Sequence, residues 1–181
     1  MINVIAGPTA VGKTTIADIL SHLKPSIHRA VSCTTRKRKR DEVNGVDYHF
    51  LSREDFERRR KRGDFAECAE VHGEWYGTLR LDLSPALRAG VEVLLVIDVQ
   101  GMREIKRQYP HVTRSIFIHP PNISTLEERI RRRDRGESEE EIARRLERAQ
   151  QEICCATEFD YEVVNGSLKP TVREVLTLLG I

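Results

Sequence analysis

The residues best suited to chemistry form a glycine-bounded loop near the N-terminus. Gly7, Gly12, Lys13 and Thr14 match the spacing G-x-x-x-x-G-K-[ST]. In such a loop, backbone N–H groups close around a polyphosphate, the lysine reaches its β and γ oxygens, and the threonine hydroxyl can hold Mg²⁺. The expected phosphate contacts are Gly7, Pro8, Thr9, Ala10, Val11, Gly12, Lys13, Thr14 and Thr15, with Thr14 as the metal ligand. An ordinary glycine-containing turn is the alternative.

The segments on either side of this loop favour the phosphate-binding interpretation. Residues 2–6 form a short apolar run, which predicts a buried strand. Apolar residues recur at helical spacing after Lys13, and Pro25 predicts the end of that helix. The N-terminus of a helix adds free N–H groups and a favourable dipole to an anion site. Strand, loop and helix therefore supply the context that the motif requires.

Residues 34–80 are expected to form a small insertion of hairpins and one helix. Ser52 begins a capping box and Gly63 suits the position just after a helix end, so a basic helix is predicted between them. Residues 65–71 and 75–78 are expected to be strands joined by a turn.

After this insertion, the α/β alternation resumes. Ser84 and Pro85 are expected to start a short helix that Gly90 ends. Residues 91–98 form an almost continuous apolar run, typical of a strand buried on both faces. Asp98 at its carboxyl end resembles a Walker-B aspartate, which handles Mg²⁺ beside a phosphate-binding loop. An ordinary turn aspartate at a strand end is the alternative.

The C-terminal part continues with helices and strands. Ser124 and Ser138 are each expected to cap a helix, and residues 131–138, which lack an apolar stripe, are expected to be a mobile segment bearing arginines. Further elements are expected at 101–108, 114–118, 161–164 and 170–179. Five strands that alternate with helices predict an α/β fold with a five-stranded parallel sheet flanked by helices.

Composition limits the class of protein. The 181 residues suit one domain, and 30 Lys and Arg nearly balance 28 Asp and Glu, for a net charge of +2. Basic runs at 36–40, 58–62 and 129–135 are typical of solvated faces and also suit an anionic ligand. The four cysteines lack metal or disulfide spacing, which predicts reduced thiols in a cytoplasmic protein without zinc. No leader and no run of about 18 apolar residues is seen, so no membrane segment is expected.

The combined motifs resemble those of guanylate kinase over nearly the whole chain. The segments that carry the resemblance are 7–15, 31–36, 42–50, 70–78, 97–101 and 138–146. The resemblance implies a P-loop core, a GMP-binding insertion and a lid, and an ATP-dependent phosphotransferase that converts GMP to GDP. It divides the chain into a core (1–33, 81–128 and 139–181), an acceptor-binding insertion (34–80) and a lid (about 129–138). It implies ATP and Mg²⁺ as cofactors and GMP as acceptor, with dGMP as a further acceptor.

The resemblance also assigns roles to matching residues. Ser32, Glu67 and Thr78 match residues that recognise guanine, and Asp98 matches one that assists them. The expected contacts to the GMP phosphate are Arg36, Lys39, Tyr48 and Tyr76. The residues expected to stabilise the transferring phosphoryl group are Lys13, Arg36, Arg133, Arg135 and Arg145. Independently, a carboxylate can accept from both N1–H and N2–H₂ of guanine, while hydroxyls can donate to O6. Tyr48 and Tyr76 could instead be packing residues, and each lid arginine could be solvated.

Four departures from the family pattern stand out, one of which is a lid that is one residue longer than usual. Lys39 occupies the place of a second phosphate arginine, Val96 that of an aspartate, and Asn165-Gly166 replaces Asn-Asp. These departures leave the acceptor open to question more than the reaction type.

The alternatives are a related kinase of an acceptor such as ribose 1,5-bisphosphate, a catalytically silent binding module, and a nucleic-acid-binding ATPase. The guanine set argues against the first of these and the intact P-loop against the second. Nearly balanced charge without an aromatic platform argues against nucleic acid. Monomer and homodimer both remain open.

Overall fold

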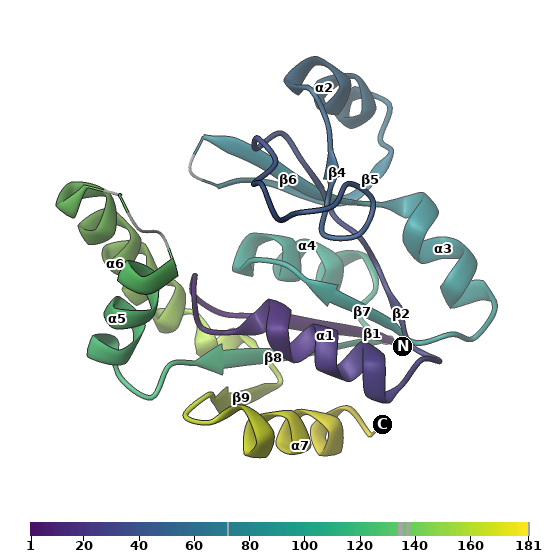
Figure 1. Cartoon of the computed structure of the whole chain (residues 1–181). Helices are drawn as coiled ribbons and strands as arrows, with labels where there is room; N and C mark the ends of the chain where they lie inside the picture. The colour runs from purple at the N-terminus through teal and green to yellow at the C-terminus, as the bar shows by residue number, and fades with distance from the viewer. Residues whose placement is uncertain (72, 134–135, 137, 181) are drawn as a thin grey trace. The chain divides into compact units, whose positions relative to one another are not determined.

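The computed structural model describes residues 1–71, 73–133, 136 and 138–180, and for Arg133 it describes only the backbone. Figure 1 shows the helices and strands of the chain, which forms two compact units. Unit 1 comprises Met1–Ile2 and Ser26–Thr113, and unit 2 comprises Asn3–Pro25 and Arg114–Ile181. Within the described residues, no helix is long and apolar enough to cross a membrane.

One sheet has five strands in the order β2-β7-β1-β8-β9. Its strands are β1 (Ile2–Ala6), β2 (His28–Arg29), β7 (Val93–Val96), β8 (Thr113–His119) and β9 (Tyr161–Val164). The β2–β7 and β8–β9 pairs are parallel. All residues of β1 are buried, as expected where both faces of a strand are covered. The predicted α/β fold with a five-stranded parallel sheet is confirmed.

A second, mixed sheet of four strands lies in unit 1. Its order is β4 (His49–Phe50), β3 (Cys33–Thr34), β6 (Glu74–Leu79) and β5 (Phe65–Val71). The β3–β4 pair is parallel, and β6 runs antiparallel to both β3 and β5. Helix α2 (Arg53–Lys61) buries Phe56, whose ring stacks on Phe65 at a centroid distance of 4.4 Å. This aromatic contact anchors a helix that is otherwise strongly basic.

Two further helices belong to unit 1, α3 (Arg80–Arg88) and α4 (Val99–Gln108). Helix α4 packs against β5, and Gln108 Nε2 donates to the Ala66 carbonyl at 2.7 Å. The predicted ends of α2 are confirmed, because Ser52 Oγ accepts from the Asp55 N–H at 3.0 Å and Gly63 follows with a φ of 73°.

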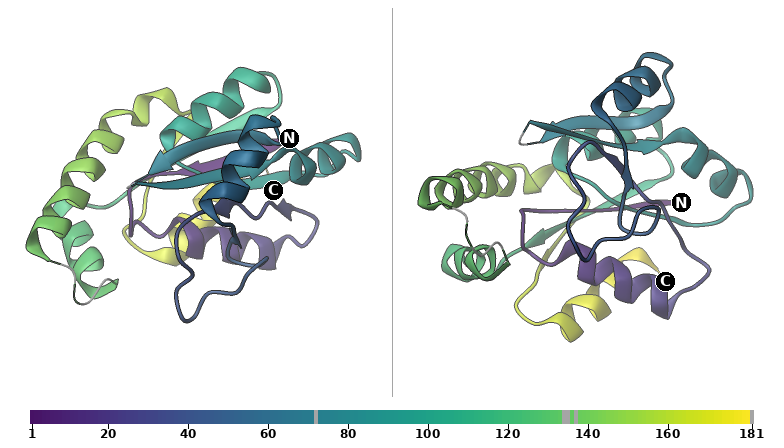
Figure 2. Two further views of the ribbon diagram at one scale, coloured as in Figure 1. Left: turned by 90° about the horizontal axis from the view of Figure 1, so that it is seen from above. Right: turned by 45° about the horizontal axis from the view of Figure 1, so that its top comes forward.

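Unit 2 contributes the helices α1 (Lys13–Leu23), α5 (Ile123–Arg133), α6 (Glu139–Cys154) and α7 (Leu168–Leu179), and the short 3₁₀ helix η1 (Ala156–Glu158). Helices α1 and α7 lie side by side in Figures 1 and 2 and bury Ile16, Leu20 and Val175 completely. Ser138 caps α6 through a hydrogen bond from the Glu141 N–H at 3.3 Å, as predicted.

Two predicted helix starts are wrong. Helix α3 begins at Arg80 rather than Ser84 and holds Pro85 inside it. Its first turn is anchored by tertiary contacts, since Leu83 is fully buried and Asp82 accepts from the Val31 N–H at 3.1 Å. Helix α5 begins one residue before Ser124, and the cap is Asn122, whose Oδ1 accepts from the Thr125 N–H at 2.7 Å.

Two further boundaries differ from the prediction. Strand β7 ends at Val96, so Asp98 is the cap of α4 and not the last residue of a strand. Helix α5 continues through residues 131–133, where a mobile segment was predicted. Arg131 explains that continuation, because it forms ion pairs with Glu127 on its own helix and with Glu139 on α6. Such pairs stabilise the last turn of the helix, where residues 131–133 carry no apolar side chain.

Candidate active site

The glycine-bounded loop of unit 2 connects β1 to α1, as the sequence predicts. Gly7 has a φ of 142° and Gly12 a φ of 105°, values that side chains of L-amino acids rarely allow. A Cβ on Gly7 would collide with the Ile118 carbonyl, and one on Gly12 would lie 2.6 Å from Asn165 Nδ2. Both glycines are therefore required by conformation and by space.

Lys13 lies over this loop as the first residue of α1. Its Nζ donates to the carbonyls of Gly7 at 2.5 Å and Pro8 at 2.9 Å. These contacts hold the ammonium group next to the N-terminus of a helix, where a bound phosphate is also favoured. Phosphate oxygens are stronger acceptors for an ammonium group than carbonyls are.

A hollow of about 570 Å³ opens beside the loop. Its lining is Ala10, Val11, Gly12, Lys13, Thr14, Thr15, Arg129, Arg132, Asn165, Gly166 and Leu168. The volume falls in the usual range for small-molecule sites, about 300–1,000 Å³. The sequence singled out neither Arg129 nor Arg132 for this site, although both belong to a basic run. It flagged Asn165 and Gly166 only as a departure from the family pattern.

The buried side chain of Asn165 holds the loop by hydrogen bonds. Asn165 Nδ2 donates to the Val11 carbonyl at 2.8 Å, and its Oδ1 accepts from Thr171 Oγ1 at 3.2 Å. Arg129 joins the same network by donating to the carbonyls of Val11 at 3.4 Å and Asn165 at 3.1 Å. A loop held at its carbonyls keeps its N–H groups directed toward a ligand.

The metal prediction rests on Thr14, which is exposed at the start of α1. Among the described residues, no group of three or more His, Cys, Asp or Glu side chains could hold a metal ion. A P-loop Mg²⁺ does not need such a group, because it takes most of its ligands from phosphates and water. The donor set therefore fits Mg²⁺ that arrives with a nucleotide.

The predicted phosphoryl-stabilising arginines of the C-terminal part are only partly described. Arg145 lies half-buried on α6. Arg133 is the last residue of α5, known here by its backbone, and Arg135 lies outside the described residues. Their catalytic roles stay predictions.

Unit 1 brings the three predicted guanine-recognition residues together. Thr78 Oγ1 donates to Glu67 Oε1 at 2.7 Å, and Ser32 Oγ lies 3.4 Å from Thr78 Oγ1. Because the single Thr78 hydroxyl hydrogen goes to Glu67, Ser32 must be the donor in the second contact. The three side chains form one chain of hydrogen bonds that ends at the Glu67 carboxylate.

A β-bulge sets this arrangement. Phe65 pairs with Leu79, but Glu67 pairs with Thr78, so β5 carries one extra residue at this point. Residues directly opposite in an antiparallel pair point to the same face. The bulge thus places Glu67 and Thr78 on one face, where a regular ladder would pair Ala66 with Thr78.

The Glu67 carboxylate is also close to the first turn of α4. Asp98 Oδ1 accepts from the Gly101 N–H at 2.8 Å, and a Cβ on Gly101 would lie 2.7 Å from Glu67 Oε2. Gly101 therefore leaves room for the carboxylate, a role that the sequence did not reveal. Burial raises the pKa of Glu67 to about 7; the Thr78 hydrogen bond lowers it in part, and the charge of Asp98 raises it further.

The predicted phosphate-binding side chains Arg36, Tyr48 and Tyr76 are also neighbours. The Arg36 guanidinium lies 5.5 Å from the Tyr48 ring centroid, and the two tyrosine rings are 5.9 Å apart. Lys39 is exposed on the following loop, where its backbone N–H donates to Glu42 at 2.8 Å. Glu42 also pairs with Arg36, although the sequence offered it only as part of the motif at 42–50.

Comparisons with known proteins agree with these motifs. The family model described as guanylate kinase matches residues 2–180. Guanylate kinase of Symbiobacterium thermophilum is 43% identical over 176 residues, covering 97% of this chain and 82% of that protein. Guanylate kinase of Synechocystis is 41% identical over 177 residues, covering 98% of this chain and 92% of that protein. The crystal structure of guanylate kinase from Anaplasma phagocytophilum has a TM-score of 0.83 and 34% identity, covering 99% of this chain and 85% of that one. The chain belongs to the guanylate kinase family.

Proposed function

We propose that this protein transfers the γ-phosphoryl group of ATP to GMP and dGMP, producing ADP and the corresponding diphosphate. The observation that carries the proposal is the buried Glu67 carboxylate at the end of the hydrogen-bonded chain from Ser32 and Thr78. This arrangement suits guanine, because a carboxylate accepts from N1–H and N2–H₂ together. Adenine has no N1–H donor and would leave the carboxylate without its partners. A site built on such bonds rejects the wrong base by about 10⁴-fold.

On the donor side, we assign ATP to the hollow beside the P-loop. Lys13 would neutralise the β and γ oxygens, and Thr14 would hold Mg²⁺, which supplies further positive charge to the transferring group. Arg36, Arg133, Arg135 and Arg145 are assigned to the charge that spreads over the phosphoryl oxygens. No covalent intermediate is needed, since positioning and charge neutralisation account for most of this catalysis.

We further assign residues 34–80 to acceptor binding, about 129–138 to a lid, and 1–33, 81–128 and 139–181 to the core. We place the enzyme in the cytoplasm, where its nucleotides occur and where the free cysteines Cys33, Cys68, Cys154 and Cys155 would stay reduced. Ribose 1,5-bisphosphate as acceptor is disfavoured, because it carries no base and would leave Glu67 buried without a use.

A coupled ADP-release assay tests the proposal. GMP, dGMP, AMP, UMP, CMP and ribose 1,5-bisphosphate are compared at equal concentration with Mg²⁺-ATP. We expect turnover with GMP and dGMP that exceeds turnover with AMP by orders of magnitude. Preference for another acceptor, or no ADP release with any of them, would overturn the assignment.

A further inference from the structure

An ion pair inside the acceptor-binding loop connects Arg36 to Glu42. Arg36 Nη2 donates to Glu42 Oε1 at 2.7 Å, and Nη1 donates to Oε2 at 3.1 Å. The side chains are only 23% and 14% exposed, respectively. A two-point contact of this kind fixes the plane of the guanidinium as well as its position.

The contacts of Arg36 with Glu42 and Lys37 use one side of its guanidinium. The two terminal nitrogens form one edge and bind Glu42, while the outer hydrogen of Nη1 goes to the Lys37 carbonyl at 2.8 Å. A guanidinium has a second edge, formed by Nε and the other Nη2 hydrogen, which neither of these two contacts uses. Arg36 also forms a side-chain hydrogen bond with Tyr76, which is itself a predicted phosphate ligand. Two oxygens of a phosphate match such an edge. One arginine can therefore be held by Glu42 and bind a phosphate at the same time.

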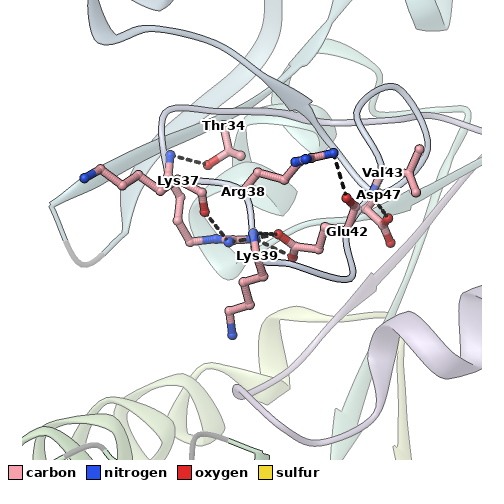
Figure 3. Close-up of polar contacts among 8 residues, drawn as sticks. Thr34, Lys37, Arg38, Lys39, Glu42, Val43 and Asp47 are labelled. Carbon is pink, nitrogen blue, oxygen red and sulfur yellow. Dashed lines mark hydrogen bonds and ion pairs between the residues drawn. The ribbon is translucent and has the colours of Figure 1, made fainter.

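Glu42 organises the loop around this arginine as well. Its Oε2 accepts from the Lys39 N–H at 2.8 Å, and its own N–H donates to the Lys39 carbonyl at 3.2 Å. Its carbonyl accepts from Arg38 Nη1 at 3.3 Å. Figure 3 shows these contacts converging on Glu42 from one turn of the chain. Loss of this carboxylate would release Arg36 and the turn together.

Electrostatics keep both partners charged. Burial raises the pKa of Glu42, but the hydrogen bonds from Arg36 and from the Lys39 backbone outweigh it, so that the pKa is lowered. Desolvation lowers the pKa of Arg36, yet the hydrogen bonds and charges of Glu42 and Tyr76 raise it overall. Tyr76 is itself one of the predicted phosphate ligands.

We propose that Glu42 is a positioning residue for the phosphate of the acceptor: it holds Arg36 by one edge and thereby presents the other edge to a nucleoside monophosphate. This proposal rests on the proposed function, because it takes Arg36 as a phosphate ligand. The alternative is that Glu42 competes with the phosphate for Arg36, and the two roles predict opposite effects of removing Glu42 on GMP affinity. A competitor would have to leave Arg36 before the phosphate binds, so its removal would tighten binding, whereas removal of a positioning residue weakens it.

The test compares Glu42→Gln with Asp47→Asn by calorimetric titration of GMP and of guanosine. Asp47 is the matched control: it lies in the same loop, where its carboxylate accepts from the Val43 N–H at 2.7 Å, and its substitution removes the same charge. For Glu42→Gln we expect GMP to bind about tenfold more weakly, by analogy with the loss of about 10- to 100-fold when a group that orients a metal ligand is removed. Guanosine, which has no phosphate, should bind unchanged, and Asp47→Asn should leave both affinities unchanged.

The outcomes separate the possibilities. Tighter GMP binding by Glu42→Gln would make Glu42 a competitor and overturn the proposal, as would an equal loss for GMP and guanosine or the same loss in Asp47→Asn. If Glu42→Gln does not fold, Glu42→Asp serves instead, because its shorter side chain cannot span both contacts and should again weaken GMP alone. A wild-type chain that binds guanosine but not GMP, or neither of them, would refute the proposed function before Glu42 is tested.

Discussion

Replacing Gly101 with alanine places a methyl group against the carboxylate proposed to recognise guanine. The new Cβ would lie 2.7 Å from Glu67 Oε2 and 3.3 Å from Ile97 Cβ, so something must move. Glu67 is only 5% exposed, and its other oxygen is held by Thr78 at 2.7 Å. Rotation of the carboxylate would break that bond, and a shift of α4 would disturb the Asp98 cap. Either response displaces the acceptor for guanine N1–H and N2–H₂.

Two opposing effects determine the stability of this variant. Alanine is a better helix former than glycine by about 1 kcal/mol. Overpacking a buried position costs about 1–3 kcal/mol. The net loss should be about 0–2 kcal/mol, which a folded domain tolerates. For GMP, loss of a buried hydrogen bond costs about 1–3 kcal/mol, or roughly 5- to 150-fold in affinity.

Steady-state kinetics measure the effect on each substrate. We expect Gly101→Ala to raise KM for GMP by this factor and to leave KM for ATP almost unchanged. Gln100→Ala, an exposed change in the same turn of α4, is the control and should behave as wild type. A folded Gly101→Ala enzyme with the wild-type KM for GMP would refute the proposed steric link between Gly101 and Glu67.

Three further predictions concern charge. Lys13→Ala should abolish phosphoryl transfer but keep a cooperative thermal transition, because Lys13 contacts loop carbonyls rather than the core; a folded variant that retains activity would contradict the P-loop assignment. Burial and the charge of Asp98 raise the pKa of Glu67 to about 7 despite the Thr78 hydrogen bond. Because a protonated Glu67 is a poorer acceptor for guanine, guanosine affinity should fall by up to about tenfold per pH unit below 7. The same shift should reduce the free energy of unfolding as pH rises from about 4.5 to about 7, because the folded chain keeps a proton that the unfolded chain releases; pH-independent guanosine binding would count against an ionised Glu67. Lys39→Arg should lower KM for GMP by about fivefold, on the order of 1 kcal/mol, with kcat unchanged, and an equal or higher KM would mean that another group serves this phosphate.

Most local signals in the sequence were reliable where neighbours along the chain decide the structure, although Asn122 and not Ser124 caps α5. Helix α1 starts at Lys13, and Ser52 and Ser138 cap α2 and α6. Each of these features depends on residues only a few positions apart. Their geometry follows from residue type and spacing, so the sequence carries them. The start of α3 could not be predicted in this way, because the burial of Leu83 and the bond from Val31 to Asp82 depend on residues far along the chain.

The family was recognised from several motifs that occur in the expected order along the chain. No single motif would have been specific enough. This recognition named Glu67, Thr78 and Ser32 as a set, and the structure places their side chains in hydrogen-bonding contact. It named Arg36 as well, but not the carboxylate that holds it. Sequence motifs do not identify the side chains that hold functional residues in place, because the role of such a side chain depends on its position in the fold more than on its residue type.

The sequence by itself determined the class of the fold, the P-loop and the identity of the side chains proposed to bind guanine. Tertiary structure alone decided how they are supported. The bulge in β5 rotates Glu67 onto the face of Thr78, the missing side chain of Gly101 leaves space for its carboxylate, and Asn165 binds the carbonyl of Val11 across 154 positions of the chain. The contacts of Gly101 and Asn165 join segments distant in sequence, and the bulge depends on the register between two paired strands. A local residue pattern specifies neither, because both are set only when the chain folds.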